Sequence, residues 1–204
     1  MPKDTFYNLN PYKKDRIMRA AIDEFASCNY EEAKLSRIIK AADIPRGSFY
    51  QYFEDKEDLY QYLFQVISEE KIKYLGPEIN NPDEISFIEL FRKLMMSGLQ
   101  FASEHPEYIQ ITRNLLYHRG HPIFNKVMGD GFELAKQYYR SYIETDKKHG
   151  RIRADVDTDF LADIIMETSS NLSFMELSQD KEVDIEQMFK RLEQFLHILQ
   201  KGIE

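Results

Sequence analysis

Apolar residues recur at intervals of three and four along most of this chain, which is the period of an amphipathic α-helix. Long alternations of Val or Ile with polar residues, the pattern of a half-buried strand, do not occur. Breaks such as Gly76–Pro77 and His105–Pro106 separate the periodic segments. The pattern therefore predicts an all-α protein of about nine helices.

Two short helices separated by a tight turn are predicted in residues 35–56. The apolar residues of 35–42 fall at i, i+3, i+4 and i+7, so they share one face of the first helix. The chain must turn at Asp43, and Ile44 is expected to pack that turn against both helices. Pro45 suits the first turn of the second helix, where its missing N–H would have no helical partner.

The second short helix brings basic, hydroxyl, amide and aromatic side chains together. Phe49 and Phe53 lie four residues apart, so we expect both to face the core. The remaining side chains are free to reach phosphate oxygens or base edges, and Gly47 would let the backbone approach a ligand closely. This is the layout of a helix-turn-helix, whose second helix lies in the DNA major groove. The expected DNA-binding residues are Lys34, Arg37, Arg46, Gly47, Ser48, Tyr50, Gln51 and Lys56.

These residues resemble the DNA-binding domain of TetR-family transcriptional regulators. The family's hallmarks stand here as Ala20–Ala21 with Phe25, as Tyr50–Gln51–Tyr52–Phe53 and as Lys56–Glu57–Asp58–Leu59. The resemblance covers about residues 12–63. It implies a three-helix DNA-binding domain followed by a helical domain that senses an effector and forms a dimer.

Several positions depart from the family pattern. Asp43 replaces the turn glycine and would have to adopt the left-handed conformation at some cost. Ala33 replaces a Thr, so a helix N-cap and a phosphate contact are lost. Asn29 stands where a glycine usually ends the preceding helix, and Pro45 and Gln51 replace the commoner Ser and His.

The charge distribution supports two parts, residues 1–56 for DNA binding and residues 57–204 for effector binding and dimerisation. The whole chain has a net charge of −8, which is unusual for a DNA-binding protein. Residues 1–56 contain ten Lys or Arg and nine Asp or Glu, whereas the remainder contains 17 and 26. The acidity therefore lies outside the part where DNA would dock, and the local charge governs docking.

The C-terminal part has broad apolar faces on several predicted helices. By analogy with the family and by periodicity, an apolar pocket is expected from Phe91, Leu94, Met95, Gly98, Leu115, Tyr138, Met166, Ser169 and Asn171. Each of these residues is also a candidate for ordinary core packing. The last helices are expected to meet a second subunit through Phe160, Ile164, Leu172, Met188, Leu192, Phe195 and Leu199.

Other functional classes have weaker support. His118 and His121 have the spacing of two metal ligands, but no Cys or carboxylate stands at a partner spacing, so no metal site is expected. Cys28 lies at the end of an amphipathic helix, which favours an inert thiol over a redox sensor. No nucleophile–base pair or paired carboxylates support an enzyme, and no cofactor is expected. A helical enzyme and a protein-binding module remain the rival classes.

Composition agrees with a globular cytoplasmic protein. Hydrophobic residues make up 43% of the 204, and 14 Phe can fill a core. No apolar run approaches 18 residues, the N-terminal stretch lacks the apolar segment of a signal peptide, and a single Cys suits a reducing compartment.

Together these features predict a homodimeric regulator that binds a palindromic operator in double-stranded DNA. A small apolar or amphipathic effector would release it, which describes a repressor. The alternatives are an activator or an effector-independent DNA-binding protein of the same fold.

Overall fold

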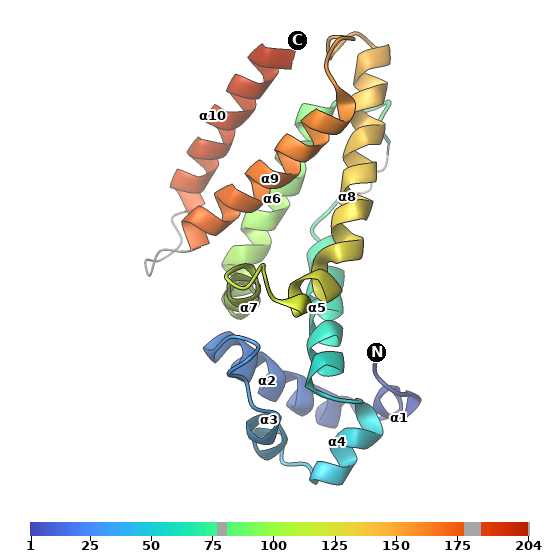
Figure 1. Cartoon of the computed structure of the whole chain (residues 1–204), viewed down its shortest axis with the longest axis vertical. Coiled ribbons are helices and arrows are strands. Elements are labelled where there is room, and N and C mark those ends of the chain that lie inside the picture. The colour runs from blue at the N-terminus through green and yellow to red at the C-terminus, as the bar shows by residue number, and fades with distance from the viewer. Residues whose placement is uncertain (77–80, 178–184, 204) are drawn as a thin grey trace. The chain divides into compact units, whose positions relative to one another are not determined.

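The computed structural model describes residues 1–76, 81–177 and 185–203, and the regular structure in that part of the chain is helical (Figure 1). The ten helices found there are α1 (Asp4–Tyr7), α2 (Pro11–Ser27), α3 (Leu35–Ala41), α4 (Arg46–Tyr52), α5 (Lys56–Ile72), α6 (Phe87–Glu104), α7 (Pro106–Leu116), α8 (Pro122–Lys148), α9 (Thr158–Leu177) and α10 (Ile185–Ile203). The all-α prediction is confirmed. Helix α1 was not predicted from the sequence, because four residues are too few for a periodic pattern.

Contacts divide the chain into two compact units. The first comprises Met1–Glu70 and His105–Val127, and the second comprises Lys71–Glu104 and Met128–Glu204. The division falls near the end of α5, and it counts α7 with the N-terminal helices. The functional boundary predicted between residues 56 and 57 remains a prediction.

The first unit is built around α2, which contacts both α3 and α7. Asn10 caps α2, because its side-chain oxygen accepts a hydrogen bond from the Lys13 N–H at 2.8 Å. Pro11 then occupies the first helical position. The buried residues of α2 are Ile17, Ala20, Ala21, Glu24 and Phe25. Four of them are apolar and lie on one face of the helix, and the fifth is a carboxylate.

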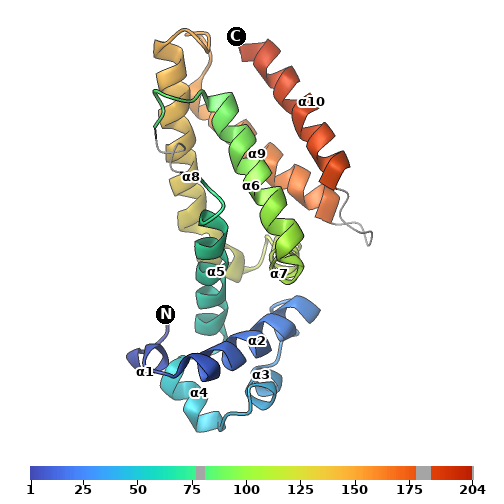
Figure 2. The same ribbon diagram turned by 180° about the vertical axis from the view of Figure 1, so that it is seen from behind.

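The second unit has a core shared by α6, α8, α9 and α10 (Figure 2). Its fully buried residues include Phe87, Phe91, Ile143 and Ile165. Asp146, which is 1% exposed, accepts a hydrogen bond from the Phe87 N–H at 2.8 Å and thereby caps the start of α6.

An ion pair also orients helices of the second unit. The Arg92 guanidinium on α6 donates two hydrogen bonds to the carboxylate of Glu193 on α10, at 2.8 and 3.2 Å. This contact joins helices that are distant in sequence and lie side by side in both views of the fold (Figures 1 and 2).

Candidate nucleic-acid interface

The turn between α3 and α4 depends on a residue with positive φ. Asp43 has a φ of 48°. No other non-glycine residue in the described part of the chain has a positive φ. The predicted left-handed conformation is thus confirmed, and Arg16 offsets part of its cost by donating to the Asp43 carbonyl at 2.8 Å. Ile44 is 7% exposed and fills the turn, while Pro45 is the extended residue just before α4 rather than within its first turn.

Helix α4 divides into a buried face and an exposed face. Phe49 and Phe53 are fully buried, as the spacing predicted. Arg46 and Gln51 are exposed, and Tyr50 is 40% exposed. The polar side chains chosen for DNA contact therefore lie at the surface.

The small residues of α4 fit the same picture. Ser48 is half-buried and Gly47 is exposed. A Cβ added at Gly47 would meet no atom within 4 Å, so nothing in the chain itself requires glycine there. If glycine is needed at this position, the need comes from a ligand that approaches the backbone.

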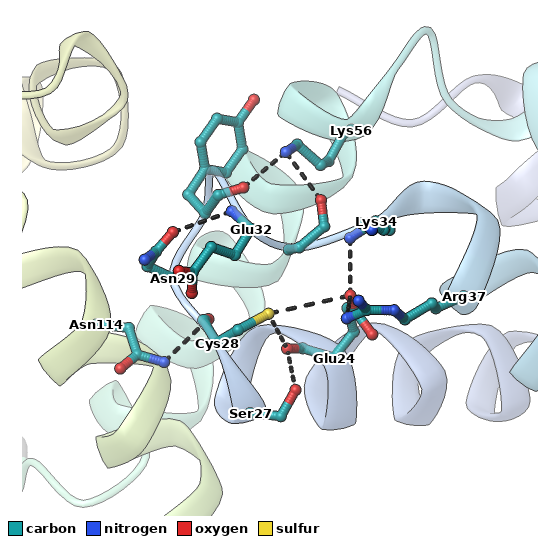
Figure 3. Close-up of polar contacts among 11 residues, drawn as sticks. Glu24, Ser27, Cys28, Asn29, Glu32, Lys34, Arg37, Lys56 and Asn114 are labelled. Atoms are coloured by element: carbon teal, nitrogen blue, oxygen red, sulfur yellow. Dashed lines mark hydrogen bonds and ion pairs between the residues drawn. The ribbon is translucent and has the colours of Figure 1, made fainter.

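The start of α3 is anchored by a buried carboxylate of α2, as Figure 3 shows. Glu24 is 9% exposed, and its Oε1 accepts from the Lys34 N–H at 2.7 Å and from the Arg37 guanidinium at 3.1 Å. Lys34 is the residue before α3, and its side chain provides no cap. Glu24 thus bonds the backbone N–H of Lys34, the N-cap residue of α3. The Lys34 side chain remains exposed, whereas Arg37 is partly committed to Glu24.

Lys56 holds the loop between α2 and α3. Its ammonium donates to the carbonyls of Tyr30 at 2.6 Å and Ala33 at 3.0 Å (Figure 3). It also lies 4.3 Å from the centre of the Tyr30 ring, a cation–π contact. Burial lowers the pKa of Lys56. Two of its three N–H groups are therefore used inside the protein, which the sequence prediction of a phosphate contact did not anticipate.

Helix α7 packs against α2, and one side-chain amide of α7 bonds the backbone at the end of α2. The Asn114 side chain donates to the carbonyls of Phe25, Ala26 and Cys28 at 3.0, 3.3 and 3.1 Å (Figure 3 draws the contact to Cys28). The Cys28 thiol donates to the Glu24 carbonyl at 3.4 Å. Neither Asn114 nor Glu24 was a predicted site residue. Glu24 was detectable as a carboxylate on an otherwise apolar helix face, whereas nothing in the sequence indicated Asn114.

Asn29 does not take the conformation that its place in the sequence suggested. Its φ is not positive, because Asp43 is the non-glycine residue with positive φ in the described part. Its side-chain oxygen instead accepts from the Glu32 N–H at 3.0 Å, which closes a local turn after α2 (Figure 3).

The two histidines proposed as unlikely metal ligands have other partners. The His118 Nδ1 lies 2.9 Å from the Asn114 carbonyl, and the His121 Nδ1 accepts from the Ile123 N–H at 3.1 Å. The part of the chain that the structure describes contains no group of three His, Cys, Asp or Glu residues placed to hold a metal ion.

The residues predicted for an effector pocket lie mainly in the core of the second unit. Phe91 is fully buried, and Leu94, Met95, Tyr138 and Met166 pack against that core. Gly98 and Ser169 are half-buried, and Leu115, 1% exposed, belongs to the first unit. The side chain of Asn171 lies outside the described residues.

A cavity of about 570 Å³ opens elsewhere in the second unit, where the start of α6 meets the ends of α8 and α10. None of the predicted pocket residues lines it. Its walls are Glu84, Ser86, Ile88, Glu89, Arg92, Asp146, Gly150, Arg151, Ile152, Gln200 and Ile203.

The residues predicted for a dimer interface differ in exposure. Phe160 is 66% exposed and Ile164 is 37% exposed, so both offer apolar surface. Leu192 is 3% exposed within the chain, because α10 turns it toward the core of its own unit, and Phe195 and Leu199 pack against that core. Met188 is half-buried, and the Leu172 side chain lies outside the described residues.

Comparison with known proteins places the helix-turn-helix in a family. The model of the bacterial regulatory proteins of the tetR family matches residues 17–63. The uncharacterized HTH-type transcriptional regulator YhgD of Bacillus subtilis (strain 168) is 26% identical over 99 residues, 48% of this chain and 51% of the relative. The chain thus spans about half the length of that relative. The probable acrEF/envCD operon repressor of Escherichia coli (strain K12) is 24% identical over 159 residues, 74% of this chain and 70% of the relative.

Solved structures extend the likeness to the whole fold. A TetR family transcriptional regulator from Chloroflexus aurantiacus J-10-FL is 28% identical, with a TM-score of 0.71 over 100% of this chain and 98% of the other. The transcriptional regulator FadR from Bacillus subtilis, solved in complex with stearoyl-CoA, is 18% identical, with a TM-score of 0.72 over 93% and 99%. The latter likeness concerns the fold alone.

The fold and the exposed second helix of the turn define a helix-turn-helix protein with a helical C-terminal part. Within that class, residues 17–63 match the tetR family of bacterial regulatory proteins, and the whole chain is similar in fold to a TetR family transcriptional regulator. None of the helices in the described residues is long and apolar enough to span a membrane.

Proposed function

We propose that this protein is a homodimeric repressor that binds a palindromic operator in double-stranded DNA. The observation that carries the proposal is the exposed face of α4, where Arg46, Tyr50 and Gln51 stand at the surface while Phe49 and Phe53 fix the opposite face in the core. A helix held in this way can enter the major groove without rearrangement of its own packing.

The exposed residues take different roles in this proposal. Arg46 and Gln51 read base edges, because a guanidinium pairs with guanine and an amide pairs with adenine. Ser48, Tyr50 and Lys34 contact phosphates and set the register on the duplex. Lys56 acts indirectly, since its ammonium already bonds the carbonyls of Tyr30 and Ala33. It supports the loop that precedes α3 rather than the DNA backbone.

The dimer interface is proposed on the exposed apolar side chains of α8 and α9. Leu134 is 70% exposed, and it accompanies Phe160 and Ile164. An ion pair between Lys136 and Asp163 joins these two helices within the chain. A two-fold dimer formed here would present two copies of α4 to successive major grooves, about 34–36 Å apart.

The effector is proposed to be a small apolar or amphipathic molecule. The cavity in the second unit offers both chemistries, because Ile88, Ile152 and Ile203 line it together with Arg92 and Arg151. The fold neighbour FadR from Bacillus subtilis was solved with stearoyl-CoA, an amphipathic thioester, which supports this class of ligand. An effector that prefers the conformation with the wrong spacing of the two α4 helices would weaken DNA binding about 5–150-fold.

Selection from a random duplex pool tests DNA binding directly. The purified protein is incubated with the pool at low salt, and bound DNA is recovered and sequenced. We expect enrichment of a palindrome, loss of binding in the Arg46→Ala, Tyr50→Ala double variant, and unchanged binding in Lys148→Ala, which removes a charge at the end of α8. No enrichment by a protein that native mass spectrometry finds free of ligand would refute the proposal.

The effector is tested on the recovered palindrome. Stearoyl-CoA, coenzyme A and stearate are titrated into the protein–DNA complex as probes of the two halves of an amphipathic ligand. One of these probes should release the protein from DNA. If the Ile152→Glu change in the cavity wall reduces that release, the result supports the proposed site. Release that is unaffected by this change would place the effector elsewhere. We propose that the protein acts in the cytoplasm, because a regulator of this kind must reach promoter DNA.

A further inference from the structure

The carbonyl groups at the end of α4 are bonded by residues that precede the helix-turn-helix in sequence. The last four carbonyls of any α-helix lack an intrahelical partner. In α4 these belong to residues 49–52, and the first of them is satisfied within the motif, because the Phe53 N–H donates to the Phe49 carbonyl at 2.9 Å. The other three are bonded by only two residues, Lys3 and Thr5.

Each of these three bonds has its own donor. The Lys3 ammonium donates to the Tyr50 carbonyl at 3.0 Å. The Thr5 hydroxyl donates to the Gln51 carbonyl. The Lys3 backbone N–H donates to the Tyr52 carbonyl at 2.9 Å. The residues whose backbone is held include Tyr50 and Gln51, whose side chains form the exposed face of α4.

An aromatic anchor fixes the same segment to the core. Phe6 is 1% exposed, and its ring centre lies 4.8 Å from that of Phe53 and 5.4 Å from that of Tyr62 on α5. Helix α1 lies against α4 in both views of the fold (Figures 1 and 2). Lys3 also forms an ion pair with Glu54 at 2.8 Å, directly after α4. The segment therefore bridges α4, the residue that follows it and α5.

We propose that Lys3 and Thr5 are positioning residues for DNA recognition, which set the orientation of α4 by bonding its last three carbonyls. A seven-residue helix has little stability of its own, so partners outside the helix decide how its ends lie. The family model matches only residues 17–63, so this segment lies outside the matched stretch. The effect on DNA binding rests on the proposed function. The support that Lys3 and Thr5 give to α4 can be measured without DNA.

Hydrogen exchange of the free protein tests whether Lys3 and Thr5 hold the end of α4. Thr5→Val removes the hydroxyl at nearly constant shape, and Thr5→Ser keeps it as the matched control. Thr5 is exposed, so neither change disturbs the core. Loss of one such bond corresponds to about a 3- to 10-fold change in a local equilibrium. We expect α4 amides to exchange faster by that factor in Thr5→Val, with α2 amides and the Thr5→Ser protein unchanged. Unchanged α4 exchange in both Thr5→Val and Lys3→Met would overturn the inference.

Binding to the selected palindrome tests the consequence. We expect the Lys3→Met, Thr5→Val double variant to lose about 10-fold or more in affinity with an unchanged salt dependence, because no phosphate contact is removed. A lysine that contacts phosphate would instead lower the slope of log affinity against log salt by about 0.9 when it is replaced. A lowered slope together with unchanged α4 exchange would show a direct contact and overturn the inference. If the unaltered protein binds no duplex, the proposed function fails, and the exchange experiment still decides whether Lys3 and Thr5 hold α4.

Discussion

The two units use polar side chains in different ways. Around α4, side chains bond to backbone groups: Lys3 and Thr5 to the end of the helix, Glu24 to the start of α3, and Asn114 to the end of α2. In the second unit, the ion pair of Arg92 with Glu193 joins two helices side chain to side chain, although side chains there such as Lys147 also bond backbone groups.

This difference bears on how each unit behaves. A bond to a backbone group fixes where a helix begins or ends, whatever side chains the helix carries on its surface. A pair of long side chains between two helices tolerates sliding, because both ends rotate and the bond can be remade. The comparison indicates that α4 is suited to presenting a fixed surface, whereas the contact between α6 and α10 tolerates small changes of helix position.

The largest expected effect is in the second unit, at its buried exception to this rule. Asp146→Ala would leave the Phe87 N–H and the Arg151 guanidinium without their shared acceptor. We expect the free energy of unfolding to fall by about 3 kcal/mol, since one partner of a buried charged contact is removed. Urea unfolding followed by circular dichroism measures this. Asp146→Asn keeps an acceptor for Phe87 and should lose less; equal losses would mean that the cap of α6 contributes little.

The next effect is at the corresponding carboxylate of the first unit. Glu24→Ala removes the acceptor of the Lys34 N–H and of Arg37. We expect a loss of about 2 kcal/mol, less than at Asp146 because the Arg37 side chain is 54% exposed and can regain water. Urea unfolding reports the size of the loss, and hydrogen exchange should localise it to α3. Faster exchange spread evenly over the first unit would contradict a capping role.

A smaller effect is expected where α7 meets α2. Asn114→Ala removes the donor shared by the carbonyls of Phe25, Ala26 and Cys28. We expect a loss of about 1 kcal/mol, because the amide has only two N–H groups to share among these carbonyls and a typical hydrogen bond contributes about that much. Thermal unfolding measures it. Asn114→Ser retains one donor, so its stability should lie between those of the unaltered protein and Asn114→Ala. A Ser variant less stable than the Ala variant would argue against the hydrogen bonds.

The smallest expected effect is a difference between the units in how salt changes the pKa of a tyrosine. Burial raises the pKa of Tyr139 to about 12, and burial followed by the charges of Glu57 and Asp55 raises the pKa of Tyr30 to about 12. In both cases the folded-state pKa exceeds the unfolded value near 10. Stability is therefore fully present below about pH 10 and is lost as the pH rises toward 12.

Salt distinguishes the causes of these two shifts. Added salt screens Glu57 and Asp55 and should lower the pKa of Tyr30 slightly, while the pKa of Tyr139, raised mainly by burial, should hardly move. NMR titration of ring-labelled tyrosine at two salt concentrations follows both residues, with Tyr30→Phe and Tyr139→Phe providing the assignments. Equal shifts in both residues would remove the distinction.

The helices and the turn were predictable from the sequence because each rests on local chemistry. The period of apolar residues predicted the long helices, and local chemistry also sets two of their ends: Asn10 caps the start of α2, and Gly150, with φ of 70°, follows α8. Asp43 was expected to be left-handed because it stands where the resembled family has its turn glycine, and its φ of 48° agrees. Helix α5 begins at Lys56 because Asp55 caps it, accepting from the Asp58 N–H at 2.9 Å.

The contacts that hold α4 were not predictable because they join segments far apart in sequence. Thr5 lies 46 residues from Gln51, and Lys3 lies 47 residues from Tyr50. No period or motif encodes such a bond, since a single hydroxyl or amide is compatible with many partners. The same reason explains Lys56, which the motif suggested for phosphate and which the fold turns toward Tyr30 and Ala33. The exposed residues of α4 remain predictions for DNA contact.

The anchoring of α4 from outside the helix also has an evolutionary meaning. Its buried positions and its carbonyl bonds fix the backbone, while Arg46 and Gln51 stand exposed at positions where a new side chain meets mainly solvent. Substitutions at these two positions should therefore leave folding nearly intact. After gene duplication, one copy could acquire a different recognition sequence by single changes in α4 and keep the rest of the protein as it is.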